Sequence, residues 1–129
     1  MDADSLRAQL EALEWPAVPH GKDTFKSEHE TDEGKMTVYV RLHENWLVAS
    51  VVPFLSTGGD NSFELARWLL RMNRDMFMTK FAYDEDGDVV LTVELPTENL
   101  DASEVSAALR SLLQHAVEHR RTLRQAAEE

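Results

Sequence analysis

The stretch "FAYDEDGDVVLTVEL", residues 81–95, decides how the rest of the chain is interpreted. It places four acids and a glycine between two apolar stretches, so the acids either bind a calcium ion or turn the chain. An EF-hand loop with Gly87 in its sixth position needs ligands at positions 1 and 12, where this chain has Ala82 and Val93. Asp86 and Gly87, by contrast, are a favoured pair for a tight turn. We therefore expect a β-hairpin.

Besides the strand that enters this hairpin, four segments have strand character. Residues 36–42 and 89–95 alternate apolar and polar side chains, which predicts half-buried strands. Residues 46–55 form an apolar run that suits a central strand, ended or placed at an edge by Pro53. Residues 25–30 form a weak, polar strand. Short polar turns join residues 25–30, 36–42 and 46–55 into an antiparallel meander.

Three further segments have apolar side chains at helical spacing. The first helix begins at Asp4 or Ser5 and ends near Trp15, before Pro16. The second covers about residues 63–73, and the third is the last element of the chain. Their candidate caps are Asp60 or Ser62, and Asp101 or Ser103. The element order α-β-β-β-α-β-β-α predicts one α+β domain over residues 1–129, with an antiparallel sheet and helices packed on one face.

Composition and charge limit the class of protein. The 129 residues include no cysteine, which removes disulfides, thiolate nucleophiles and thiolate metal sites. The formal net charge is −11, and residues 84–104 hold eight acids and no Lys or Arg. Such a surface repels phosphate backbones, so we expect no nucleic-acid partner and more readily a basic one. The acidic N-terminus and the lack of a long apolar run predict a cytoplasmic protein without a membrane partner.

The loop "STGGDNS", residues 56–62, resembles a phosphate-binding loop only in its glycines. It has no lysine and matches neither GxxxxGK[ST] nor GxGxxG, which favours a simple strand-to-helix connection. His115 and His119 stand four residues apart, a spacing at which two imidazoles can share a metal ion. Glu118 is not in the position of an HExxH base, and the sequence indicates no third ligand. We expect no metal, no cofactor and no enzymatic activity.

The second predicted helix is apolar over an arc nearly twice the width that packing on a sheet requires. The surplus predicts a second buried surface, most simply with a twofold-related copy of the chain. One edge of the helix carries Phe63 and Leu70, and the other carries Trp68 and Met72; either edge suits a homodimer interface. The alternative is coverage by the chain's own loop or first helix. The arginine stripe, Arg67, Arg71 and Arg74, is expected to face solvent and make salt bridges.

Residues 69–105, "LLRMNRDMFMTKFAYDEDGDVVLTVELPTENLDASEV", resemble the central signature of the bacterial YbjN-like family. The resemblance rests on an Asn-Arg pair after an apolar helix, a Lys-Phe strand, an Asp-x-Asp-Gly hairpin, a strand ending in Leu-Pro, and an acidic lead into a long helix. It implies the fold of type III secretion chaperones. It also implies a small acidic homodimer that binds protein segments and transforms no substrate.

These expectations suggest a binding surface. Helices on one sheet face leave the other face partly open, and an edge strand can accept an extended peptide. If residues 36, 38 and 40 face the helices, then Tyr39 and Arg41 point to the open face, with Trp46 or Leu47 nearby. Tyrosine and arginine are enriched at binding hot spots. We predict that these three residues contact a partner, ordinary sheet packing being the alternative. The chain is then an adaptor or chaperone-like module, or a dedicated type III secretion chaperone for one effector.

Overall fold

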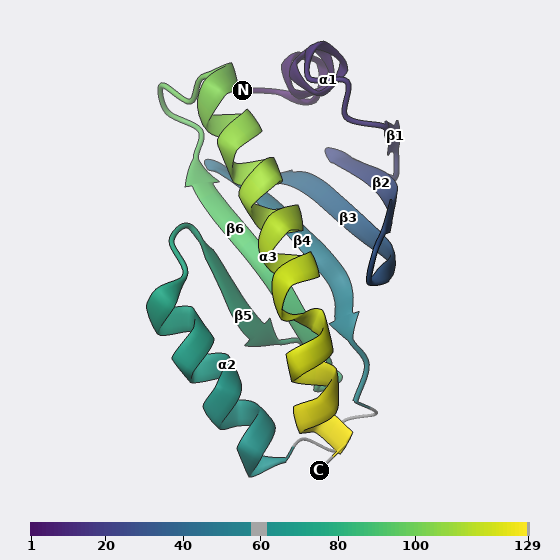
Figure 1. Cartoon of the computed structure of the whole chain (residues 1–129). Helices are drawn as coiled ribbons and strands as arrows, with labels where there is room; N and C mark the ends of the chain where they lie inside the picture. Colours follow the sequence, from purple (N-terminus) through teal and green to yellow (C-terminus); the bar gives the residue numbers. More distant parts are fainter. Residues whose placement is uncertain (58–61, 129) are drawn as a thin grey trace.

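The computed structural model describes residues 1–57 and 62–128 of the chain. It confirms an α+β fold with the expected element order and adds one short strand (Figure 1). The elements, in chain order, are α1 (Ala3–Ala12), β1 (Ala17–Pro19), β2 (Thr24–Thr31), β3 (Gly34–His43), β4 (Trp46–Leu55), α2 (Phe63–Asp75), β5 (Thr79–Tyr83), β6 (Val89–Pro96) and α3 (Ala102–Glu128).

The strands form one six-stranded sheet in the order β1-β2-β3-β4-β6-β5, with every pair antiparallel. The meander supplies four neighbouring strands, and the hairpin β5–β6 adds to β4 through β6. The three helices of the described chain lie on one face of this sheet (Figure 1). Helix α3 crosses β4 and β6, α2 flanks β5, and α1 lies toward β2.

The hydrophobic core lies between the sheet and α3. Because side chains alternate along a strand, each central strand contributes one apolar row to the helix side. Helix α3 returns a stripe at helical spacing from Val105 to Ala126. The rings of Phe54 and Phe81 meet with centroids 5.1 Å apart and anchor the hairpin to β4. The buried strand residues of this core are Phe25, Met36, Val38, Val40, Leu47, Ala49, Val51, Phe54, Leu55, Phe81, Val89, Leu91 and Val93.

The hairpin prediction is confirmed, but residues 84–88 form a longer loop in place of the tight turn expected at Asp86-Gly87. The Oδ1 atom of Asp84 accepts the backbone N–H groups of Asp86 and Asp88, at 2.9 and 3.0 Å. Gly87 takes a positive φ of 82°, which a glycine adopts at little cost. Asp88 in turn accepts the N–H of Thr57 at 2.9 Å, which ties the hairpin to the end of β4. These carboxylates are therefore used as turn formers.

Helix caps show where sequence reasoning succeeded and where it did not. The prediction of Asp4 or Ser5 as the first cap is wrong: Asp2 accepts the N–H of Ser5, and Ser5 Oγ accepts the N–H of Asp2, a capping box begun two residues earlier. Ser62 caps α2 as predicted, accepting the N–H of Leu65 at 3.0 Å. Asp101 accepts the N–H of Glu104 at the start of α3. Asp60 and most of the glycine loop lie outside the described residues.

Two features of the strands were not anticipated. The three-residue strand β1 adds to the outer edge of β2, in a segment for which no strand was predicted. Pro53 lies inside the central strand β4, at a shift of register between Val51 and Leu55, and ends neither the strand nor the sheet. The shift removes the ladder hydrogen bond that a proline cannot donate.

Candidate protein-binding surfaces

The face of the sheet opposite the helices carries all three residues predicted to contact a partner. Strand register pairs Tyr39 with Ser50, Arg41 with Val48, and His43 with Trp46. Since paired residues share a face, Tyr39, Arg41 and Trp46 lie together there, with Trp46 roughly 13 Å along β4 from Ser50. We refer to this surface as the open face. Its placement follows the predicted alternation; the role of the three residues stays a prediction.

Tyr39 sits in a small basic setting at the centre of β3. Its ring meets the ring of His20 at 5.3 Å, and Lys26 Nζ lies 6.0 Å from its centroid. Arg41 is exposed and has no ion-pair partner within the part of the chain that the structure describes. Its five N–H donors are therefore available to a carboxylate or a carbonyl of another molecule. In a chain of net charge −11, this local cluster of basic groups stands out.

Trp46 marks one end of the open face. Its side chain is 44% exposed, and it lines a hollow of about 420 Å³ with Pro96 and Glu98. Between it and Tyr39 the sheet presents half-buried Val48 and a hydrogen-bonded pair, Ser50 and Thr92, whose hydroxyl oxygens are 2.9 Å apart. Sequence reasoning missed Val48, although its pairing with Arg41 follows from the length of the β3–β4 turn. The surface is mixed, with apolar side chains beside the N–H donors of Arg41.

The outer edges of the sheet are closed to strand addition only in part, because β1 covers residues 25–27 of β2 and leaves residues 28–31 without a neighbouring strand on that side. On β5, Asn73 of α2 donates its side-chain amide to the carbonyl of Phe81, at 3.1 Å, and accepts the Phe81 N–H at 2.7 Å. On β1, the N–H of Ala17 is bound to the carbonyl of Trp15, and Pro19 has none to offer. A partner strand finds few free donors at these two places, whereas the outer side of residues 28–31 stays open to it.

Helix α2 presents the second surface. Phe63 and Leu70 are 79% and 71% exposed, whereas Trp68 and Met72 are half-buried against the core. Phe77, just after the end of the helix, is also 85% exposed. The wide apolar arc is thus divided into an inner half, which packs on the fold, and an outer half without cover. We call Phe63, Leu70 and Phe77 the outer edge of α2; sequence reasoning missed Phe77.

The arginine stripe of α2 is used differently from the expectation. Among the described residues, Arg74 alone of the stripe makes a salt bridge, with Asp75 at 3.0 Å, and this contact lowers the pKa of the Asp75 carboxyl. Arg71 lies over the ring of Trp68 at 5.0 Å, and Arg67 over Phe63 at 5.9 Å. These are cation–π contacts, in which the guanidinium covers aromatic surface that water would otherwise reach.

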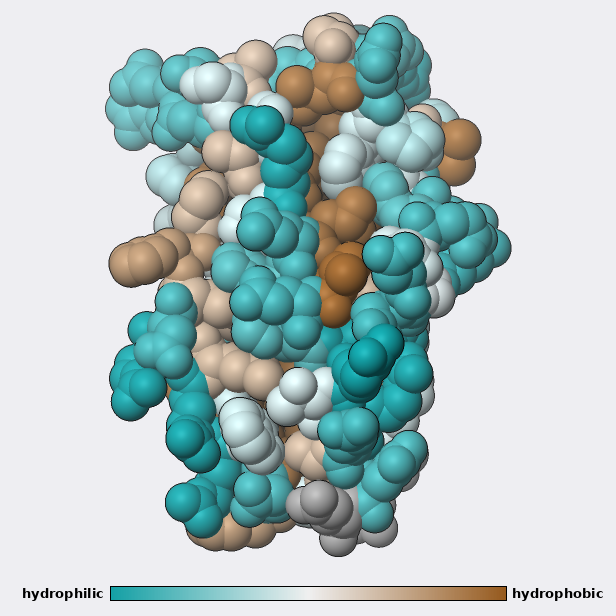
Figure 2. Space-filling view, viewed as in Figure 1, coloured by the Kyte–Doolittle hydropathy of each residue, from teal (hydrophilic) through white to brown (hydrophobic). Residues whose placement is uncertain are grey.

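A groove on the helix side was also missed. Figure 2 shows an apolar band beside α3, on the side of β2 and β3. The groove there has a volume of about 670 Å³, with Leu113 and Val117 as its apolar lining and Glu30, Asp32 and Glu118 among its polar residues. The β2–β3 turn forms one wall because Arg121 Nη2 holds Glu33 Oε1 at 2.9 Å. No sequence pattern brings these two segments together.

His115 and His119 border the apolar stripe of α3, as expected. Their rings stack with centroids 5.9 Å apart and an interplanar angle of 4°. Burial lowers the pKa of His119, with a smaller contribution from His115, against the opposing effect of Glu118. The structure also places Glu118 with them, a neighbour that sequence reasoning had set aside. None of the described helices combines the length and apolarity needed to cross a membrane.

Three solved structures are similar to this one. YbjN of E. coli, described as a putative transcription regulator, matches with a TM-score of 0.71 and 14% identity over 95% of this chain and 93% of that one. The ExsC–ExsE complex matches with a TM-score of 0.66 and 22% identity over 95% and 97%. The Yersinia pestis type III secretion chaperone SycH, in complex with a fragment of YscM2, matches with a TM-score of 0.59 and 20% identity over 90% and 97%.

These TM-scores establish a shared fold, that of type III secretion chaperones, as the sequence resemblance implied. No curated protein sequence matches the chain. A family model does match, and it spans residues 2–125. The signature residues Asn73, Lys80 and Asp86-Gly87 are the ones that hold α2, β5 and the hairpin together. The chain belongs to the YbjN family, described as putative bacterial sensory transduction regulators.

Proposed function

We propose that this protein is a single-domain, non-enzymatic adaptor with chaperone-like activity, which binds a segment of another protein on its open face and works as a cytoplasmic homodimer. The observation that carries the proposal is that exposed Arg41 and Trp46 and half-buried Tyr39 share a sheet face that no helix of the described chain covers. The similar folds seen in chaperone complexes support a protein partner.

The chemistry of the open face indicates what the partner segment contains. Arg41 offers a two-pronged donor that suits a carboxylate. Tyr39 and Trp46 offer aromatic surface, which gives contact area at a small cost in side-chain entropy. These side chains supply most of the binding free energy in this proposal. The segment we expect is extended, with an apolar side chain next to an acidic one.

The homodimer rests on the outer edge of α2. Phe63 and Leu70 would pack against the same residues of a twofold-related copy, with Trp68 and Met72 supporting them from the core side. Burial of a Leu or Phe side chain is worth about 1.5–3 kcal/mol, so leaving this row in water is costly. The open face remains accessible in such a dimer, because α2 lies on the other side of the sheet (Figure 1).

The runner-up is a dedicated type III secretion chaperone for one effector. The structure of the HopA1–SchA chaperone–effector complex, with a TM-score of 0.63 and 16% identity, is the comparison that favours it. The two functions differ in partner range: a secretion chaperone copurifies with one dominant secreted protein, whereas a regulatory adaptor binds a protein that stays inside the cell.

The test is a quantitative capture experiment from native lysate of the source cells at physiological salt, with eluted proteins identified by mass spectrometry. The bait is the wild-type chain, the Tyr39→Ala/Arg41→Ala double variant, or a matched control, Arg110→Ala, which removes an exposed arginine from α3. We expect a stoichiometric partner with the wild type and the control, and at least about tenfold less with the double variant, since hot-spot truncations cost about 2 kcal/mol or more. Equal recovery by all three baits would refute the open face.

A further inference from the structure

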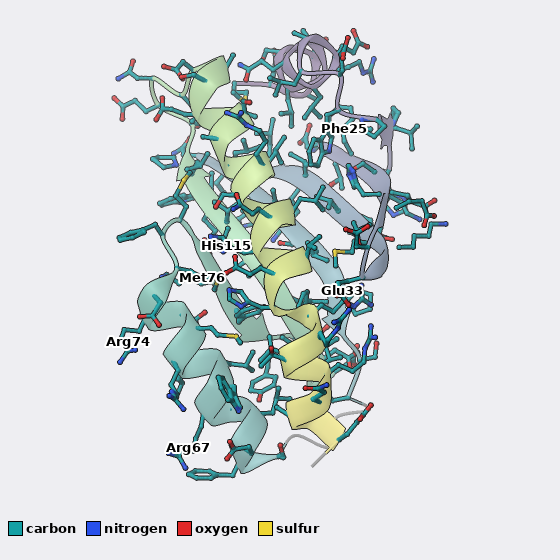
Figure 3. All side chains as sticks on the ribbon, viewed as in Figure 1. Phe25, Glu33, Arg67, Arg74, Met76 and His115 are labelled. Atoms are coloured by element: carbon teal, nitrogen blue, oxygen red, sulfur yellow. The ribbon has the colours of Figure 1, made fainter. Side chains whose placement is uncertain are left out.

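Helix α3 brings together three side chains with metal-ligating chemistry. His115, Glu118 and His119 are spaced at i, i+3 and i+4, which places them on neighbouring turns of one helix flank. One ligand atom from each, two ring nitrogens and a carboxylate oxygen, lie within 4.8 Å of one another. Figure 3 shows His115 on the side of α3 that faces α2 and β5.

The surroundings hold the two imidazoles in place. The ring of His119 meets the ring of Phe81 on β5 edge-on, with centroids 6.2 Å apart, and the His115 ring stacks on the other side. The backbone of Phe81 is itself fixed by two hydrogen bonds with the side chain of Asn73. Side chains held by such packing lose less conformational entropy when they bind a ligand than free surface histidines do.

One polar atom in the cluster lacks a partner. Nδ1 of His115 is buried and makes no hydrogen bond within the described part of the chain. Oε2 of Glu118 lies 3.8 Å from this nitrogen, too far for a hydrogen bond. Two ligands of one tetrahedral zinc ion lie roughly 3.3 Å apart, so a small movement of the exposed Glu118 side chain places both atoms on one ion.

We propose that His115, Glu118 and His119 form a binding site for a divalent transition-metal ion of the zinc class. Two imidazole nitrogens and one carboxylate oxygen make up the donor set, and a fourth position stays open to water or to a group of a partner protein. Imidazole donors select zinc, nickel and copper over calcium and magnesium, which prefer oxygen ligands. The motif reads His-x-x-Glu-His, the reverse of the HExxH order considered in the sequence.

Packing alone would explain the stacking of the two histidine rings. Packing does not require the Glu118 carboxylate beside the rings, nor a buried nitrogen without a partner. Both features have one explanation if a cation binds between these groups. An ion at this position would also fix the part of α3 that lies against β5 and α2.

The test is calorimetric titration of the full chain, stripped with a chelator, with Zn²⁺ at neutral pH. We expect one ion per chain with an affinity in the micromolar range. His115→Ala and His119→Ala each weaken binding by about tenfold or more, because each removes a primary ligand, and Glu118→Gln weakens it less. The matched controls are His43→Ala, an exposed histidine on β3, and Asp86→Asn in the acidic hairpin; neither changes the affinity.

Two results would overturn the proposal. One is the absence of saturable Zn²⁺ binding; the other is unchanged binding by the His115→Ala/His119→Ala double variant. Circular dichroism checks that each variant is folded. If a histidine variant does not fold, Glu118→Gln decides: its side chain is 58% exposed, and unchanged zinc affinity in that variant removes Glu118 from the site. Mg²⁺ titrated in parallel must show no comparable binding.

Discussion

At the scale of single residues, Asn73 explains why the family signature contains an asparagine at the end of an apolar helix. Its side-chain amide makes both a donor and an acceptor bond to the backbone of Phe81. Lys80 completes the junction, since its ammonium group donates to the carbonyls of Asn73 and Met76 at 2.6 Å and caps the end of α2. The edge strand β5 is thereby fastened to the helix before it.

Replacement of Asn73 by alanine should lower the free energy of unfolding by about 1–3 kcal/mol, because an N–H and a carbonyl of β5 lose their partners at a half-buried position. Urea unfolding followed by circular dichroism measures the change. Arg74→Ala is the matched control on the next residue, where an exposed ion pair contributes little. Equal stability of the two variants would mean that water replaces the Asn73 bonds without loss.

The residues of the open face show how far single positions can be predicted. Alternation along residues 36–42 was enough to place Tyr39 and Arg41 on the face away from the helices, because the side-chain period of a strand is two. The neighbours were beyond reach: His20 packs against Tyr39 from a loop 19 residues earlier in the chain. Such contacts depend on the docking of separate segments, which periodicity does not describe.

At the scale of elements, strongly periodic segments were predictable and short ones were not. Strand β1 has three residues and ends in Pro19, which is too short to show a period. It forms because it pairs with the edge of β2. Helix α2 shows that a clear period can still leave the orientation of a helix undecided. Its apolar arc was evident, but two edges fitted an interface equally well, and only the position of the core shows that Trp68 faces inward and Leu70 outward.

The N-terminal segment that contains α1 and β1 is attached to β2 partly through an aromatic contact. The ring of Trp15 lies 4.5 Å from that of His29, and a ring nitrogen of His29 lies 2.8 Å from Ser27 Oγ. Burial lowers the pKa of His29 below its ordinary value of 6.5. The unfolded chain therefore takes up this proton first as the pH falls, which favours unfolding.

Stability should consequently be at its full value above pH 6.5 and should fall as the pH drops through the lower pKa of folded His29. Thermal unfolding measured between pH 7.5 and about 5 checks this, because carboxyl groups with lowered pKa, such as Glu28, respond only at lower pH. The His29→Gln variant should show a shallower decline, with the remainder due to His119. An identical pH dependence in wild type and variant would contradict the assignment.

At the scale of the whole molecule, the two proposed surfaces are separated by the sheet. The open face lies on one side, and α2 with its outer edge lies on the other, flanking β5 (Figure 1). Dimerisation through α2 would leave two open faces pointing away from the interface, so one dimer could hold two partner segments. The charge of each chain, −11, opposes association at low salt, so the apolar edge must outweigh this repulsion.

Leu70→Asp should therefore convert the protein into a folded monomer. The substitution places a charge in the middle of the proposed apolar interface, while its exposure of 71% in the single chain spares the core. Light scattering after size exclusion should give twice 14.7 kDa for the wild type and 14.7 kDa for the variant. Trp68→Asp is a poorer test, because Trp68 is half-buried and its replacement also disturbs the fold.

Gln125→Asp supplies the matched control, since it adds the same charge at an exposed position of α3 outside the proposed interface. This variant should remain dimeric, which separates the loss of apolar contact from a general effect of net charge. Salt gives an independent measure: raising it screens the repulsion between chains and should tighten the wild-type dimer, whereas Leu70→Asp should stay monomeric. A Leu70→Asp chain that is still dimeric at micromolar concentration would exclude the outer edge of α2 as the dimer interface.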